Sequence, residues 1–183
     1  ARRAGVGMLT VACPTETTPL FQVTMPGALV APLAQKAEFA ELLRTKRRSA
    51  VLIGPGAGVS VATGERVLAA LESQIACVLD ADALTSFADR RDELLQALRP
   101  GCVLTPHDGE FTLLLGSRIG SDRLSAARRL AALTGAVVAL KGPATVVADS
   151  EGRTLVVTAG DERLATAGTG DVLSGIVGAL LAQ

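Results

Sequence analysis

Short apolar runs rich in Val, Ile, Leu and Ala alternate along the chain with longer segments whose apolar positions recur every three or four residues. The short runs predict strands, and the longer segments predict amphipathic helices. We expect helices at residues 38–48, 60–74, 90–99 and 110–133, and a last one after Asp171. We expect strands at residues 7–14, 50–54, 76–82, 102–106, 136–142, 145–149 and 154–159.

Most of the expected strands are apolar throughout and separated by a helix, which is typical of a parallel sheet covered by helices on both faces. The last strands follow one another too closely for crossover helices, so an antiparallel hairpin is expected at one edge of the sheet. No internal repeat, low-complexity tract or linker interrupts the pattern. The sequence therefore predicts one α/β domain over residues 1–183.

Composition narrows the classes of partner. The 18 basic and 18 acidic residues balance, which gives no electrostatic case for binding nucleic acid or an anionic membrane. Trp and Tyr are absent, and no apolar run approaches the roughly 20 residues that span a bilayer. Cys13, Cys77 and Cys102 share no metal-ligand spacing and are predicted to be small buried residues of a cytoplasmic protein. We expect a small-molecule substrate.

Glycines and charged residues gather where the expected strands end. In an open α/β sheet, ligands bind beyond the carboxyl ends of the strands, which meet along one edge. Five segments stand at such ends: "GPGAG" (54–58), "DADAL" (80–84), "TPHDGE" (105–110), "KGPAT" (141–145) and "AGTGD" (167–171). Together they predict a ligand site at this edge.

The first two segments leave alternatives open. "GPGAG" is either a phosphate-binding turn or a plain tight turn between a strand and a helix. Val61 stands where a dinucleotide fingerprint would need its third glycine, which argues against an NAD-dependent oxidoreductase. Asp80 and Asp82 could hold magnesium through water or cap the next helix, and the local sequence favours capping.

The next two segments carry a histidine and a lysine. His107 is the only histidine and stands between Pro106 and an expected helix start at Glu110, and a ligand contact is favoured over a plain polar role. Lys141 ends an apolar strand, where its point charge suits a phosphate, although a solvated hairpin lysine explains the stretch equally well.

The segment before the last helix gives the strongest signal. Gly168, Thr169 and Gly170 allow successive backbone N–H groups to turn inward beside the positive helix end, which predicts an anion hole for a transferring phosphoryl group. Asp171 would then face the acceptor and take its hydroxyl proton as general base. The alternative is an aspartate that merely caps the helix.

In this order the segments resemble those of the NAD(P)H-hydrate dehydratase family, of the ribokinase-like fold. That family carries "GPGLG", "DADAL", "TPHPGE", "LKGAGT" and "GTGDVLxGxIxGLLAQ", where this chain has "GPGAG", "DADAL", "TPHDGE", "LKGPAT" and "GTGDVLSGIVGALLAQ". Asp108 replaces the usual proline and Thr85 a common asparagine. The family extends further at both ends, so residues 1–183 are expected to be an incomplete domain.

The resemblance implies a hydro-lyase that restores NADH or NADPH from its (S)-hydrate (NADHX or NADPHX). A nucleotide bound with Mg²⁺ would phosphorylate the hydrate's hydroxyl, and phosphate would then leave. We expect ADP rather than ATP as the phosphoryl donor. Asp171 would be the base and, with Gly58 and His107, would contact the hydrate. The residues implied for the nucleotide are Lys141, Gly142, Pro143, Ala144, Thr145 and Gly170. No metal-ligating side chain is assigned.

The resemblance also implies a tetramer and a fusion to, or association with, an epimerase that acts on the same hydrate. Two alternatives keep the fold and change the function: a ribokinase-like kinase for a vitamin precursor, and an inactive nucleotide-binding relative. Free phosphate alongside an unphosphorylated product would separate the dehydratase from the kinase.

Overall fold

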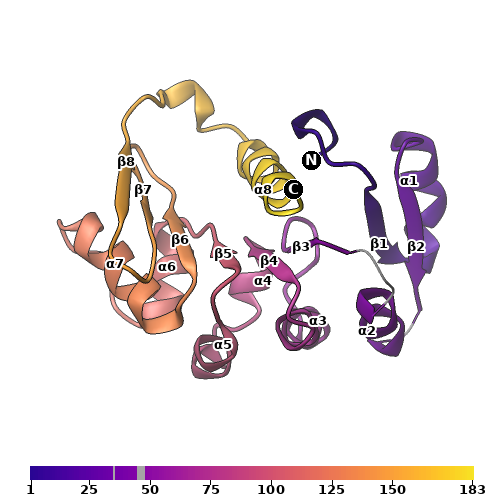
Figure 1. Cartoon of the computed structure of the whole chain (residues 1–183), viewed down its shortest axis with the longest axis horizontal. Coiled ribbons are helices and arrows are strands. Elements are labelled where there is room, and N and C mark those ends of the chain that lie inside the picture. Colours follow the sequence, from indigo (N-terminus) through magenta and orange to yellow (C-terminus); the bar gives the residue numbers. More distant parts are fainter. Residues whose placement is uncertain (35, 45–47) are drawn as a thin grey trace.

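The computed structural model describes residues 1–34, 36–44 and 48–183 (Figure 1). Six strands form one sheet in the order β3-β4-β5-β6-β7-β8. The first four run parallel, and β7 and β8 are antiparallel to their neighbours. The strands are β3 (Ala50–Ile53), β4 (Ala76–Leu79), β5 (Cys102–Leu104), β6 (Val137–Leu140), β7 (Thr145–Ala148) and β8 (Thr154–Val157). The expected parallel sheet with a late antiparallel hairpin is confirmed.

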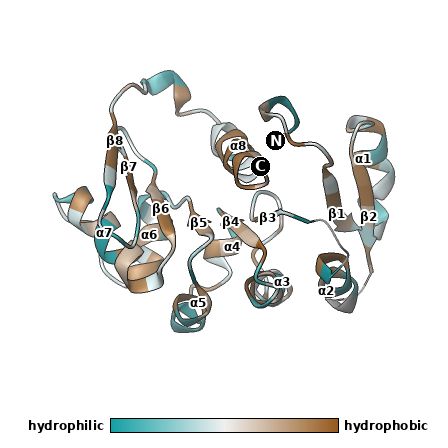
Figure 2. Cartoon of the chain, viewed as in Figure 1, coloured by the Kyte–Doolittle hydropathy of each residue, from teal (hydrophilic) through white to brown (hydrophobic). Residues whose placement is uncertain are grey.

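Helices lie on both faces of this sheet. One face carries α8 (Thr169–Leu181) against β3 and β4, and α3 (Val61–Glu72), α5 (Arg91–Ala97) and α7 (Arg123–Thr134) lie on the other face. Figure 2 shows α8 as largely hydrophobic and α5 as largely hydrophilic. The remaining α-helices are α1 (Thr18–Thr24), α2 (Lys36–Arg44), α4 (Asp82–Thr85) and α6 (Asp108–Leu115).

The N-terminal part differs from the sequence prediction. The strand expected at 7–14 forms as β1 (Thr10–Pro14), but it pairs in parallel with β2 (Leu29–Leu33) and not with the six-stranded sheet. Strand β2 was not predicted, because Pro32 within a short run argues against a strand, and the short helix α1 was not predicted either. Short 3₁₀ turns stand at Arg2–Ala4, Thr15–Thr17 and Glu162–Leu164.

One expected helix divides into two. The prediction of a helix at 110–133 was wrong, because Gly116 adopts a left-handed φ of 66° and ends α6. Helix α7 begins after Asp122, whose side chain accepts a hydrogen bond from the Ser125 amide at 2.9 Å. Residues 45–47 of the helix expected at 38–48 lie outside the described residues.

The core lies between the sheet and the helices α3 to α7. Its largest fully buried side chains include Phe87, Phe111, Leu79, Leu84, Leu94 and Leu104. Cys13, Cys77 and Cys102 are buried and free, as expected. The hydrogen bond with Cys102, together with burial, raises the pKa of the Cys77 thiol well above its ordinary value, so this thiol stays protonated.

Candidate active site

The carboxyl ends of the parallel strands place four of the five predicted segments along one edge of the sheet. Gly58 follows β3, Asp80 follows β4, His107 follows β5 and Lys141 follows β6. The N-terminus of α8 reaches the same edge, since a Cβ built on Gly170 would lie 3.7 Å from Lys141 Nζ and 3.9 Å from Asp80 Oδ2. The structure thus brings the predicted anion hole and the predicted phosphate-binding lysine together.

The first turn of α8 has unused backbone donors. Gly168 precedes the helix with a left-handed φ of 89°, and no side chain caps the helix. The amides of Gly170 and Asp171 have no acceptor among the residues that the structure describes. Free N–H groups at a positive helix end favour an anion. The geometry therefore suits a phosphoryl oxygen at this turn.

The acids of the edge fall into two classes. Asp80, Asp82 and Glu110 are each bonded to protein donors, whereas the exposed Asp171 carboxylate has no hydrogen-bond or ion-pair partner within the described part of the chain. Asp80 is only 1% exposed and Glu110 5% exposed. Among these four acids, Asp171 is therefore the one whose carboxylate is available to act on a bound molecule.

The turn between β3 and α3 is held mainly by its own contacts. The Gly58 amide donates to Asp82 Oδ2 at 2.8 Å, and the Thr63 hydroxyl donates to the Gly58 carbonyl at 2.7 Å. A Cβ on Gly54 would overlap the carbonyl oxygen of Asp80, whereas one on Gly58 would meet nothing within 4 Å. The plain-turn interpretation therefore accounts for Gly54, and space for a ligand remains beside Gly58.

The expected capping role of the two "DADAL" aspartates was wrong. Helix α4 begins after Ala81 and has no side-chain cap, because Asp80 turns inward and Asp82 turns toward Gly58. Ala81 adopts φ 47° and ψ −119°, and the Ala83 amide donates to the Asp80 carbonyl at 3.0 Å. These angles are those of a turn position that glycine usually occupies, so the backbone is strained here.

His107 caps α6. Its Nδ1 accepts from the amides of Gly109 and Glu110 at 2.9 and 3.3 Å, and Glu110 Oε2 accepts from the His107 amide at 2.8 Å. This reciprocal capping arrangement places the imidazole hydrogen on Nε2, which lies 3.3 Å from Glu110 Oε1. Sequence reasoning missed the role because histidine is not among the preferred capping residues.

The 141–145 loop is held in place by contacts to its first residue, Lys141. Lys141 Nζ donates to Asp80 Oδ1 at 2.6 Å and lies 3.9 Å from Glu110 Oε2. Arg123 donates to the Lys141 carbonyl at 2.8 Å and pairs with Asp108 at 2.7 Å. Asp108 thereby helps to hold the same loop. Gly142 and Pro143 are exposed, and Ala144 and Thr145 are partly buried.

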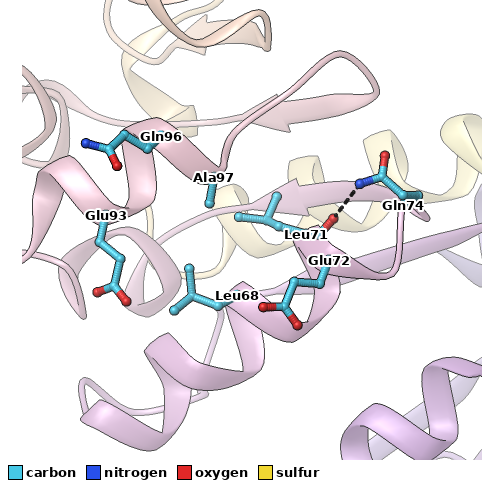
Figure 3. Close-up of a pocket in the computed structure, with 7 residues that line it drawn as sticks. All are labelled: Leu68, Leu71, Glu72, Gln74, Glu93, Gln96 and Ala97. Atoms are coloured by element: carbon cyan, nitrogen blue, oxygen red, sulfur yellow. Dashed lines mark hydrogen bonds between the residues drawn. The ribbon is translucent and has the colours of Figure 1, made fainter.

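Among the described residues, the three predicted to bind the hydrate are not joined to one another. No hydrogen bond or ion pair within the described ranges joins Gly58 to His107 or to Asp171. The structure also contains a concavity between α3 and α5, lined by none of the predicted residues (Figure 3). Its lining residues are Leu68, Leu71, Glu72, Gln74, Glu93, Gln96 and Ala97. Both helices run away from the carboxyl edge of the sheet, so this concavity is separate from the candidate site.

The described residues contain no group of three His, Cys, Asp or Glu side chains that could hold a metal ion. Asp80 and Glu110 are occupied by protein donors, so the edge offers no protein cage for a divalent cation. Magnesium usually keeps several waters and binds with the substrate's phosphates. The residues present therefore fit an ion carried by a nucleotide. No helix in the described parts of the chain has the length and apolar character to cross a membrane.

Comparison with known proteins places these features in a family. The family model described as NAD(P)H-hydrate dehydratase matches residues 1–183. The bifunctional NAD(P)H-hydrate repair enzyme Nnr of Synechocystis is 40% identical over 188 aligned residues, which cover 100% of this chain and 36% of that protein. The chain thus spans about a third of the length of this curated relative.

Two solved structures share the fold. The ADP/ATP-dependent NAD(P)H-hydrate dehydratase of Bacillus subtilis, co-crystallised with ATP and Mg²⁺, has a TM-score of 0.81 and 28% identity, covering 100% of this chain and 64% of that one. A ribokinase-like superfamily protein of Enterococcus faecalis has a TM-score of 0.83 and 26% identity, covering 100% and 63%. The expected ribokinase-like fold is confirmed.

Proposed function

The chain belongs to the NAD(P)H-hydrate dehydratase family, and from that premise we propose that it restores NADH and NADPH from their (S)-hydrates at the expense of a nucleotide. The observation that carries the proposal is the first turn of α8. There the unbonded amides of Gly170 and Asp171 stand beside a carboxylate without a partner among the described residues. An anion hole and a free base at one helix end are what phosphoryl transfer to a hydroxyl requires.

The proposed mechanism assigns the two charges of this turn to two molecules. The turn 168–170 holds the oxygens of the transferring phosphoryl group, and Asp171 takes the proton of the hydrate's hydroxyl. The substrate's oxygen attacks phosphorus, and the bond to the nucleotide's leaving phosphate breaks. Phosphate then departs from carbon with the help of the ring nitrogen's electron pair, and loss of a proton to water from the neighbouring ring carbon forms the C=C double bond. Hydroxide is a poor leaving group, which is why the phosphorylation is needed.

The remaining residues bind and orient. We propose that Lys141 and the 141–145 loop hold the nucleotide, with ADP as the donor and AMP as the product. The Lys141 ammonium has three N–H donors and is about a fifth exposed, so one donor can reach a phosphate while another stays on Asp80. Mg²⁺, when bound with the nucleotide, neutralises phosphate charge. Gly58 and His107 would contact the hydrate.

The nature of the product tests this function against a vitamin-precursor kinase, which the same fold and the same anion hole would also serve. Phosphorus NMR of a reaction containing the hydrate, ADP and Mg²⁺ is expected to show AMP and free phosphate in equal amounts. A stable phosphorylated organic product in place of free phosphate would favour the kinase. Nucleotide binding without any turnover would favour an inactive relative.

Lys141→Ala is expected to weaken ADP binding by about tenfold, because a charge-assisted hydrogen bond contributes on the order of 1.5–3 kcal/mol. The same change leaves the buried Asp80 carboxylate without its cation, so the free energy of unfolding should fall by about 3 kcal/mol, the low end for a buried ion pair. Calorimetry with ADP and Mg²⁺ measures the first effect, and urea unfolding measures the second. Unchanged ADP affinity would place the nucleotide elsewhere.

We further propose that the protein is cytoplasmic, assembles as a tetramer and acts with an epimerase. The name of the bifunctional repair relative supports a second activity in the same pathway of repair. Val172, Ile176 and Leu180 form an exposed apolar stripe on α8, which supports self-association. Light scattering of the purified protein should give a mass near four protomers. A monomer at micromolar concentration would contradict the tetramer.

A further inference from the structure

Asp80 is a buried acid that the proposed mechanism does not use. It is 1% exposed and accepts three hydrogen bonds: from its neighbour's amide, Ala81 N, at 2.9 Å, from Lys141 Nζ at 2.6 Å, and from the hydroxyl of Ser174. A carboxylate removed from water is tolerated only with such compensation. Two of the three donors come from elements that are far from Asp80 in the sequence.

Ser174 ties Asp80 to α8. It is fully buried, one turn after Gly170, and its hydroxyl lies within hydrogen-bond distance of Asp80 Oδ2 and of the Gly170 carbonyl, the latter at 2.9 Å. A hydroxyl has one hydrogen to donate, and the charged carboxylate is the stronger acceptor. The hydrogen bond to Asp80 therefore fixes the first turn of α8 on the carboxyl end of β4.

Lys141 ties the same carboxylate to the end of β6. Its ammonium lies next to the first turn of α8, as the 3.7 Å separation from a Cβ built on Gly170 shows. A cation beside a positive helix end is repelled by it. The Asp80 carboxylate offsets that repulsion and holds the ammonium where an anion would meet both the lysine and the α8 amides.

We propose that Asp80 is a positioning residue, which fixes the first turn of α8 through Ser174 and the 141–145 loop through Lys141 at the spacing that nucleotide phosphates need. The inference rests on the proposed function in taking a nucleotide as the ligand of this edge. It assigns Asp80 no contact with the substrate. Its effect is to order the binding groups before the ligand arrives, which lowers the cost of binding.

The direction in which ADP affinity changes distinguishes a positioning role of Asp80 from a purely electrostatic effect of its charge. Asp80→Asn removes a negative charge near the phosphate site while keeping the size of the side chain. If Asp80 acted only through its negative charge, an anionic nucleotide should bind the variant more tightly. On the positioning role, Lys141 loses its anchor, and ADP should bind about tenfold more weakly, a coupling within the usual range for residues in contact.

The test is a double-mutant cycle with ADP and Mg²⁺, measured by calorimetry on the parent protein, Asp80→Asn, Lys141→Ala and the double variant. Far-UV circular dichroism confirms that each variant is folded at the temperature used. We expect Asp80→Asn to weaken binding about tenfold in the parent and by only a few-fold when Lys141 is absent, because the positioning of α8 through Ser174 is then the contribution that is still lost. Tighter or unchanged binding by Asp80→Asn, or an equal loss in both backgrounds, would overturn the proposal.

Ser174→Ala tests the contact to α8 with a smaller change, should Asp80→Asn fail to fold. We expect it to weaken ADP binding several-fold, because the first turn of α8 loses its hydrogen bond to Asp80. Thr134→Ala is the matched control, since Thr134 is also a buried helical hydroxyl but stands at the end of α7, before β6 begins. It should lower stability without changing ADP affinity. Unchanged ADP affinity for Ser174→Ala would overturn the proposal, and a parent that does not bind ADP would overturn the proposed function itself.

Discussion

Asp171→Asn is expected to lower the turnover number by roughly a hundredfold or more, the usual contribution of a general base. Asparagine keeps the size of the side chain and its ability to hydrogen bond at a helix start, but it cannot take the hydroxyl proton. Substrate affinity should stay nearly unchanged, because the lost interaction belongs to the transition state. A single-turnover measurement of NADH formation from the hydrate gives the rate of the chemical step directly.

Asp122→Asn is the matched control for this variant. Asp122 is also an acid at the beginning of a helix, but its carboxylate caps α7 by accepting from the Ser125 amide. The same exchange there should leave turnover unchanged. If Asp171→Asn regenerates NADH within a few-fold of the parent rate, Asp171 serves only at the helix start and another group is the base.

Gly54→Ala is expected to lower the free energy of unfolding by about 3 kcal/mol or more. The φ of 143° at this position is strained for any residue with a side chain, and the added Cβ would overlap the Asp80 carbonyl oxygen. Each effect costs on the order of 1–3 kcal/mol. Urea unfolding followed by circular dichroism measures the loss.

Gly56→Ala separates the overlap from the effect of backbone conformation. Gly56 also has a positive φ, 68°, but a Cβ there would meet nothing within 4 Å. Gly56→Ala should lower the free energy of unfolding by about 1 kcal/mol, the cost of a left-handed conformation alone. Equal losses for the two variants would show that the β3 turn does not press on the backbone at Asp80.

The sheet and the edge that carries the site could be predicted from the sequence because both depend on local signals. Uninterrupted apolar runs mark the buried parallel strands, and glycines and charges mark their ends. Strand β2 and its pairing with β1 could not be predicted, since Pro32 argues against a strand and nothing local fixes which strand β1 joins. The break after Gly116 was missed because the apolar spacing continues on both sides of it.

The sequence predicts the individual residues of the site but not the hydrogen bonds that join them. Gly170, Lys141 and Asp171 stand in local patterns that indicate an anion site. The bond between Asp80 and Ser174 joins residues 94 positions apart, and a serine within an apolar helix gives no sign of its partner. Arg123 likewise lies mid-sequence with nothing to connect it to the Lys141 carbonyl. Such contacts follow from the packing of α7 and α8 on the sheet.

The return of reduced-nicotinamide absorbance from hydrated NADH is the direct test of whether this protein restores NADH. The purified protein is incubated with the (S)-hydrate and Mg²⁺, with ADP, with ATP, and without nucleotide. Absorbance is expected to return with ADP, to return more slowly with ATP, and not to return without a nucleotide. Absorbance that fails to return with either nucleotide, or that returns equally well without one, would contradict the proposed function.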